Sequence, residues 1–194
     1  MIKRTHTCGE LTKNDIGTHV KLNGWIAKTR DLGGLIFIDL RDRYGKTQIV
    51  FNEELNQDTF NYVKKLGLED VIGIEGTVIE RPEDAINKSM ITGFIDVEVD
   101  KVIVYNESEP TPFDIGDRNS ASEEHRLRYR YLELRTKELQ KNINLRSQTS
   151  LIVRDHLSKQ NFIEVETPIL MKSTPEGARD FLVPSRLNPG KFYA

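Results

Sequence analysis

A segment rich in proline, glycine and small polar residues divides this chain of 194 residues at residues 106–121. It contains two prolines, Pro110 and Pro112. Because proline fixes φ and cannot donate a backbone hydrogen bond, the segment suits neither a helix nor a central strand. Apolar residues before it mostly alternate, as in strands, whereas those after it recur at helical spacing. The sequence therefore predicts an all-β domain over residues 1–105, a linker over 106–121 and a second domain over 122–194.

Five β-rich runs and one short helical pattern make up the first domain. The runs cover residues 20–26, 35–40, 47–51, 71–79 and 95–105. The helical pattern lies between the third and fourth runs, starts at a cap formed by Asp58, places Phe60 and Val63 on one side and ends at Gly67. Three strands, a helix and two strands in this order indicate an OB-fold, a barrel whose second and third strands bind oligonucleotides. A small β-barrel without a nucleic-acid ligand is the alternative.

Composition and charge exclude several classes of protein. Charged residues make up 30% of the chain, and no run approaches the ~18 apolar residues of a membrane-spanning helix. Cys8 is the single cysteine, which excludes a disulfide framework. The first residues lack the apolar core of a signal peptide, so a cytoplasmic setting without membrane contact is expected. The net charge is −2, yet residues 118–146 hold eight basic and four acidic residues, which form either a local phosphate-binding patch or a solvated helix face.

Helical signals open the second domain. Ser122 is predicted to cap a helix that places Leu127, Tyr131 and Leu134 on one face. A second helix is predicted over roughly 138–160, with its apolar residues buried according to their spacing. Helical periodicity thus replaces the alternation of the first domain.

A strand and a loop follow these helices. Residues 162–168 alternate as a strand that ends at Pro168. Residues 173–186 form a loop rich in glycine, proline and arginine, in which Glu176 precedes Gly177. A carboxylate on a glycine-hinged loop suits closure on the ammonium group of a substrate, and an ordinary surface loop is the alternative. No group of residues has metal-ligand spacing, and no glycine-rich phosphate-binding motif occurs.

Three residues of the first domain are candidates for nucleic-acid recognition. Phe37 lies in the second predicted strand and Gln48 in the third, where an OB-fold presents stacking aromatics. Single-stranded bases stack on such rings and expose edges that an amide can read. Arg30 precedes the turn before the second strand and is within reach of the same surface. Because a slip of one residue exchanges the two faces of a strand, burial of Phe37 in the barrel core is the alternative.

Five segments resemble one family. They are residues 24–42, which include Arg-Asp-Leu-Gly-Gly-Leu-Ile-Phe-Ile-Asp-Leu, residues 128–135, 162–170 and 173–186, and the end of the chain, 189–194. They are similar to the anticodon-binding domain, hinge helix, motif 1, flipping loop and following strand of class II aspartyl-tRNA synthetases of bacterial type. Asparaginyl and lysyl enzymes share the barrel and motif 1 but diverge in the loop, so the resemblance favours aspartate.

The resemblance implies roles for residues of the barrel. Phe37 matches the aromatic residue that stacks on an anticodon base, Gln48 the amide that reads one, and Arg30 a basic anticodon contact. Where relatives usually read Thr-Gly-Glu-Ile-Glu, this chain has Phe94 and Asp96 in place of the two glutamates. Phe94 would lose an anticodon contact of the first glutamate, and Asp96 could keep the role of the second.

The resemblance also implies roles outside the barrel. Glu176 matches the loop carboxylate that contacts the amino group of aspartate, and Pro168 matches the motif 1 dimer interface. Leu32 stands where enzymes that also charge the asparagine tRNA often carry histidine, which favours a form restricted to tRNA(Asp). A full enzyme of this family is a cytoplasmic homodimer that activates L-aspartate with ATP and Mg²⁺ and transfers it to tRNA(Asp).

The resemblance stops before the parts that hold ATP. Motifs 2 and 3, with the arginines that bind the phosphates, would follow Ala194. The expected architecture is therefore an OB-fold barrel followed by the start of an α+β catalytic domain, which binds the anticodon but is inactive alone. A stand-alone RNA-binding module without catalysis and an asparagine ligase are the alternatives.

Overall fold

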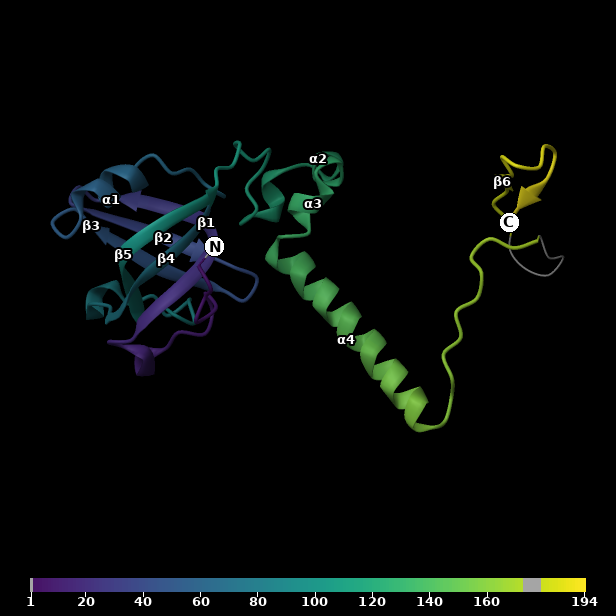
Figure 1. Ribbon diagram of the computed structural model, residues 1–194, viewed down its shortest axis with the longest axis horizontal. Coiled ribbons are helices and arrows are strands. Elements are labelled where there is room, and N and C mark those ends of the chain that lie inside the picture. The colour runs from purple at the N-terminus through teal and green to yellow at the C-terminus, as the bar shows by residue number, and fades with distance from the viewer. Residues whose placement is uncertain (1, 173–178) are drawn as a thin grey trace. The chain divides into compact units, whose positions relative to one another are not determined.

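The computed structural model describes residues 2–172 and 179–194, and within these the side chain of Arg118 is excluded. The chain packs as two compact units, Met1–Gln140 and Lys141–Ala194. The larger unit is built on five strands and a short helix (Figure 1): β1 (His19–Asp31), β2 (Leu35–Arg41), β3 (Lys46–Asn52), α1 (Gln57–Val63), β4 (Val71–Glu80) and β5 (Ile95–Asn106). Two short helices follow in the same unit, α2 (Glu123–Arg128) and α3 (Arg130–Glu133).

The five strands close into a barrel in the order β1-β2-β3-β5-β4. All neighbours are antiparallel except β3 and β5, which run parallel. The order of strands and the position of α1 between β3 and β4 confirm the predicted OB-fold.

Strand alternation fills the barrel with aliphatic side chains. Ile36, Ile38 and Leu40 of β2 are buried, as are Ile72 and Ile74 of β4. The intervening side chains point out of the barrel, because successive residues of a strand face opposite sides.

The cap of α1 differs from the prediction. The side chain of Asn56 accepts a hydrogen bond from the backbone N–H of Thr59 at 2.9 Å, so Asn56 is the N-cap. Asp58 lies in the first turn, where its charge favours the helix dipole without capping. Phe60 and Val63 are buried, as their spacing predicted.

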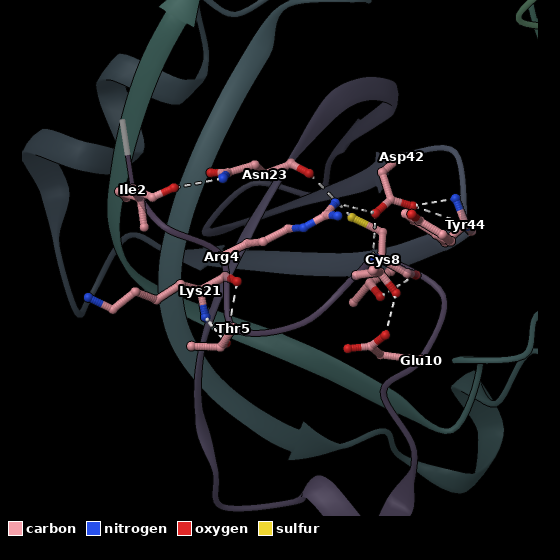
Figure 2. Close-up of polar contacts among 12 residues, drawn as sticks. Ile2, Arg4, Thr5, Cys8, Glu10, Lys21, Asn23, Asp42 and Tyr44 are labelled. Atoms are coloured by element: carbon pink, nitrogen blue, oxygen red, sulfur yellow. Dashed lines mark hydrogen bonds and ion pairs between the residues drawn. The ribbon is translucent and has the colours of Figure 1, made fainter.

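Hydrogen bonds and an ion pair attach the segment before β1 to the barrel (Figure 2). The backbone carbonyl of Ile2 accepts a hydrogen bond from the side chain of Asn23 at 2.8 Å. The Asp42 carboxylate accepts from the backbone N–H of Cys8 at 3.0 Å and of Tyr44 at 2.7 Å, and lies 3.6 Å from the Arg4 guanidinium. Asp42 thus holds the N-terminal segment and the β2–β3 turn together.

The helix predicted after Ser122 is broken. Ser122 does cap α2, accepting from the backbone N–H of His125 at 3.3 Å, but the chain leaves helical geometry at Tyr129, with φ −110° and ψ 45°. The break changes which residues face inward, so the predicted apolar face is wrong: Leu127 and Tyr131 are exposed. Leu132 is buried instead, in a cluster with Phe113 and Ile115.

The smaller unit has no buried side chain among its described residues. It contains most of α4 (Lys137–Lys159) and a two-stranded sheet of β6 (Val183–Pro184) and β7 (Phe192–Tyr193). The predicted burial of the second helix is wrong, because Leu139 is only half-buried and the apolar residues of α4 beyond it, Ile152 among them, are exposed. The strand predicted over 162–168 is also wrong, because its extended backbone pairs with no other strand of the described chain. Within residues 2–172 and 179–194, no helix is long and apolar enough to cross a membrane.

Candidate nucleic-acid interface

Polar and aromatic side chains gather on the outside of β1, β2, β3 and β5. We call this surface the outer face and define it by Arg30, Phe37, Asp39, Gln48 and Asp96. Cross-strand register brings them together: Arg30 is opposite Phe37, and Asp39 is opposite Gln48. Asp96 directly precedes Val97, which pairs with β3 one residue beyond Gln48.

Phe37 lies outside the barrel core. Its neighbours Ile36 and Ile38 are buried inside, so the Phe37 ring points outward and is half-buried. Val50 of β3 is its partner on the side away from Arg30. An aromatic ring in this position offers a flat apolar surface beside a guanidinium group, which suits a stacked base.

A hydrogen-bond network fixes Arg30 and Gln48. The Nη2 atom of Arg30 donates to the Gln48 side-chain oxygen at 2.7 Å and to the Asp39 carboxylate at 3.3 Å. Lys46 lies 3.6 Å from the other oxygen of Asp39. Because the amide oxygen of Gln48 accepts from Arg30, its NH₂ group is directed away from that guanidinium, and the residue as a whole is 8% exposed.

Asp96 is held more tightly than the sequence indicated. Its Oδ1 atom accepts from Arg81 Nε at 3.1 Å and Nη2 at 2.7 Å, and both residues are about 95% buried, with exposed fractions of 5% and 4%. Burial raises the pKa of the Asp96 carboxyl, and the nearby guanidinium groups of Arg81 and Arg30 oppose that rise. Arg81 was not among the predicted site residues. It directly follows β4, whose Ile79 pairs with Asp96, and this register cannot be read from the sequence.

Two loop residues flank the outer face. Leu32 lies in the β1–β2 turn and is largely exposed. Phe94, which replaces a glutamate of the resemblance, lies before β5 with its ring 5.0 Å from the Lys13 ammonium group. Both positions are accessible to a ligand that crosses the outer face.

The remaining predicted site residues lie apart from this face. Glu176 lies outside the described residues. Pro168 is exposed in the extended stretch of the smaller unit. Across the part of the chain that the structure describes, no group of three or more His, Cys, Asp or Glu side chains converges as a metal site would require.

Two family models match consecutive parts of the chain. Residues 20–103 match the OB-fold nucleic acid binding domain, and residues 122–194 match the tRNA synthetases of class II for D, K and N. The whole chain is 50% identical to an aspartate–tRNA(Asp/Asn) ligase of Thermoanaerobacter sp. (strain X514). The chain matches the N-terminal part of class II aspartyl-tRNA synthetases.

The chain spans about a third of the length of the curated relatives it matches. It covers 33% of the Thermoanaerobacter protein, and 32% of an aspartate–tRNA(Asp/Asn) ligase of Aquifex aeolicus, to which 99% of the chain is 50% identical. Among solved structures, it is similar to the asparaginyl-tRNA synthetase of Pyrococcus horikoshii in complex with asparaginyl-adenylate. That match has a TM-score of 0.82 and 28% identity, over 100% of this chain and 42% of the other.

Proposed function

We propose that this chain carries the anticodon-reading part of an aspartate–tRNA ligase. The observation that supports it most directly is the outer face, where a half-buried aromatic ring lies beside an amide that an arginine orients. Such a face reads unpaired bases, because each base offers a ring to stack and an edge to bond. The anticodon loop of tRNA(Asp) is the ligand that a synthetase of this family would place there.

Each residue of the outer face has a task in this proposal. Phe37 stacks on one anticodon base, Gln48 donates to the edge of another, and Arg30 orients Gln48 and attracts the phosphate backbone. Asp96 accepts from a base while Arg81 holds it in place. These contacts bind and orient the tRNA, and none of them breaks or forms a covalent bond.

The proposed whole enzyme works in the cytoplasm as a homodimer and joins L-aspartate to tRNA(Asp) through aspartyl-adenylate, with ATP consumed and Mg²⁺ required. Its domains are a barrel over 1–105, a linker over 106–121 and the start of the catalytic domain over 122–194. Glu176 would hold the amino group of aspartate, and Pro168 would lie at the dimer interface. The described residues offer no carboxylate cluster that fits Mg²⁺, so no chemical step is assigned to them.

Substitution of Phe37 tests the proposal. Phe37→Ala should weaken binding of a labelled tRNA(Asp) anticodon stem-loop by about 1–3 kcal/mol, the value of one base–aromatic stack. Tyr62→Ala is the matched control, because Tyr62 is an exposed aromatic residue on α1. Equal affinities for the Phe37 variant and the unaltered chain, measured by fluorescence anisotropy, would contradict the proposal.

A stand-alone RNA-binding module is the second candidate, because the barrel closes around a core of its own. We expect no aspartate-dependent ATP–pyrophosphate exchange from these 194 residues in either case, since motifs 2 and 3 would follow them. The reading frame beyond codon 194 separates the two candidates. Continuation towards motifs 2 and 3 supports the ligase, and a stop codon supports the module. Exchange that depends on asparagine in the extended protein would instead support an asparagine ligase.

Leu32 bears on which tRNA is charged. The Thermoanaerobacter and Aquifex relatives carry both tRNA(Asp) and tRNA(Asn) in their names, whereas the resemblance at Leu32 favours tRNA(Asp) alone. We propose that the unaltered chain prefers the tRNA(Asp) stem-loop and that Leu32→His makes the affinities for the tRNA(Asp) and tRNA(Asn) stem-loops more similar. Competition between the two stem-loops measures this, and equal binding by the unaltered chain would contradict it.

A further inference from the structure

Glu69 occupies an unusual position between the barrel and the residues that follow it. It lies in the loop between α1 and β4, in left-handed backbone geometry with φ of 67°, and its N–H donates to the Ile26 carbonyl at 2.7 Å. A residue other than glycine rarely adopts this geometry, so surrounding contacts must fix it. Its side chain is only 8% exposed.

The Glu69 carboxylate binds two arginines from different parts of the larger unit. One oxygen accepts from Arg41 of β2 at 2.6 Å, and the other accepts from Arg135, which follows α3, at 2.5 Å. The Arg135 guanidinium also lies over the ring of Trp25, at 4.5 Å from its centroid. Trp25 and Arg41 are cross-strand partners, so both contacts fasten Arg135 to one place on the barrel.

Asp70 makes a second connection beside the first. Its Oδ1 atom accepts from the backbone N–H of Ser108, at the start of the linker, at 2.7 Å. Its Oδ2 atom accepts from the N–H of Gly67 at 2.7 Å, which fixes the loop itself. Consecutive acidic residues therefore hold both ends of residues 106–136, which we call the hinge segment.

The charges show why Glu69 is the decisive member. Hydrogen bonds between a carboxylate and two guanidinium groups are strong, particularly where water is largely excluded. Without its charge, Arg41 and Arg135 would be neighbouring cations with no anion between them, and their repulsion would move Arg135 away. Trp25, Arg41 and Arg135 also belong to the sequence motifs of the family resemblance, although the anticodon contacts use none of them.

We propose that Glu69 is a positioning residue that clasps the hinge segment to the barrel through Arg135, and so fixes the point at which α4 begins. The clasp forms without RNA, and it holds the hinge segment in a constant place relative to the outer face. An anticodon bound on the outer face would then keep a fixed position relative to the hinge segment.

The single tryptophan makes the clasp observable. Glu69→Gln and Arg135→Met should each uncover the Trp25 ring, giving a red-shifted emission and about twofold stronger quenching by acrylamide. The guanidinium that covers the indole is displaced in the first variant and removed in the second. Amide exchange of residues 132–136 should rise about tenfold, the change that 1.4 kcal/mol of lost local stability produces. Glu80→Gln is the matched control, because Glu80 pairs with Lys13 on the exposed surface.

The outcomes separate a clasp from general instability. Amides of the barrel strands should keep their protection in both variants, and Arg135→Lys should retain part of the Trp25 coverage because the charge remains. Unchanged Trp25 quenching and unchanged exchange of residues 132–136 in Arg135→Met would overturn the proposal. If Glu69→Gln does not fold, Arg135→Met decides alone, since Arg135 lies outside the barrel core. All measurements are made without RNA, so their outcome is independent of the anticodon proposal.

Discussion

At the scale of the residue, the surroundings of the single cysteine determine how readily its thiol ionises (Figure 2). Cys8 is fully buried, its N–H donates to Asp42, and its Sγ lies 3.8 Å from the Asn23 carbonyl oxygen. Burial raises the pKa of the thiol well above its usual range, and the negative charge of Asp42 adds to the rise. Since the thiolate is the reactive form, Cys8 should be inert in the folded protein.

This pKa has a measurable consequence for stability. The thiol ionises in the unfolded chain near pH 9 but stays protonated in the folded one, so stability is lost as pH rises above that value. We expect a loss of about 1.4 kcal/mol for each pH unit above 9, on top of the other groups that titrate there. The difference between the unaltered chain and Cys8→Ala in urea unfolding at pH 8 to 10.5 isolates this slope. A constant difference across that range would contradict the prediction.

Arg30 offers a second test at this scale. Arg30→Met removes one phosphate-attracting charge, so the dependence of stem-loop affinity on salt should weaken by about 0.7 in log–log slope. Arg30→Lys keeps the charge but loses the fork that orients Gln48, so the slope should persist while affinity falls. Titrations at several salt concentrations measure both quantities. Equal slopes for the Met variant and the unaltered chain would place Arg30 away from the RNA backbone.

The outer face shows how far sequence reasoning reaches for single residues. Alternation along β2 left open whether Phe37 points outward or into the core, and the burial of Ile36 and Ile38 in the structure decides for the outward position. The partnership of Asp96 with Arg81 depends on the register of β4 against β5, which no local pattern determines. The same holds for Glu69, whose arginines come from distant segments.

At the scale of the element, one glycine decides how closely β4 and β5 approach. A Cβ atom on Gly76 would lie 2.2 Å from the backbone oxygen of Glu98, next to the point where the register of the two strands shifts. Backbone cannot move aside as a flexible side chain can. We therefore expect Gly76→Ala to lower the free energy of unfolding by about 1–3 kcal/mol through overpacking, measured in urea. Gly34→Ala is the matched control, since nothing lies within 4 Å of its Cβ position, and equal losses in both would contradict the prediction.

Elements of the barrel were predictable because their partners lie within the same unit. The five strands and α1 each show their own periodicity, and each lies against neighbours in the same unit that bury its apolar side chains. The helix after Ser122 has a regular apolar spacing too, but it breaks at Tyr129, and Leu132 packs in a cluster with Phe113 and Ile115. Tertiary packing overrides periodicity there, as it does wherever a short helix meets a fixed cluster.

At the scale of the whole molecule, the two units differ in what holds them. The large apolar cluster belongs entirely to the barrel, whereas described residues beyond Gln140 bury no side chain. A strand over 162–168 was expected from alternation, but a strand is stable only with a hydrogen-bonded neighbour, and the described chain supplies none. Sequence patterns report a preference for burial, and they do not supply the partner that satisfies it.

This difference predicts which part of the molecule unfolds locally most readily. A 23-residue helix without packing is marginal in water, so α4 should exchange its amides far faster than the barrel strands. Trypsin should therefore cut after Arg146 and Arg154, which are exposed, long before Arg41, which is held in β2. Mass spectrometry of a digestion time course measures the order of cleavage.

Digestion at several protein concentrations is the control for this experiment. If two copies cover each other's exposed helices, as the proposed homodimer would allow, cleavage after Arg146 and Arg154 should slow as the protein concentration rises. Cleavage after Arg41 should not change, because the barrel core protects it at any concentration. Strong protection of both α4 sites at the lowest concentration would contradict an unpacked helix, and the residues that cover it would then have to come from the chain itself.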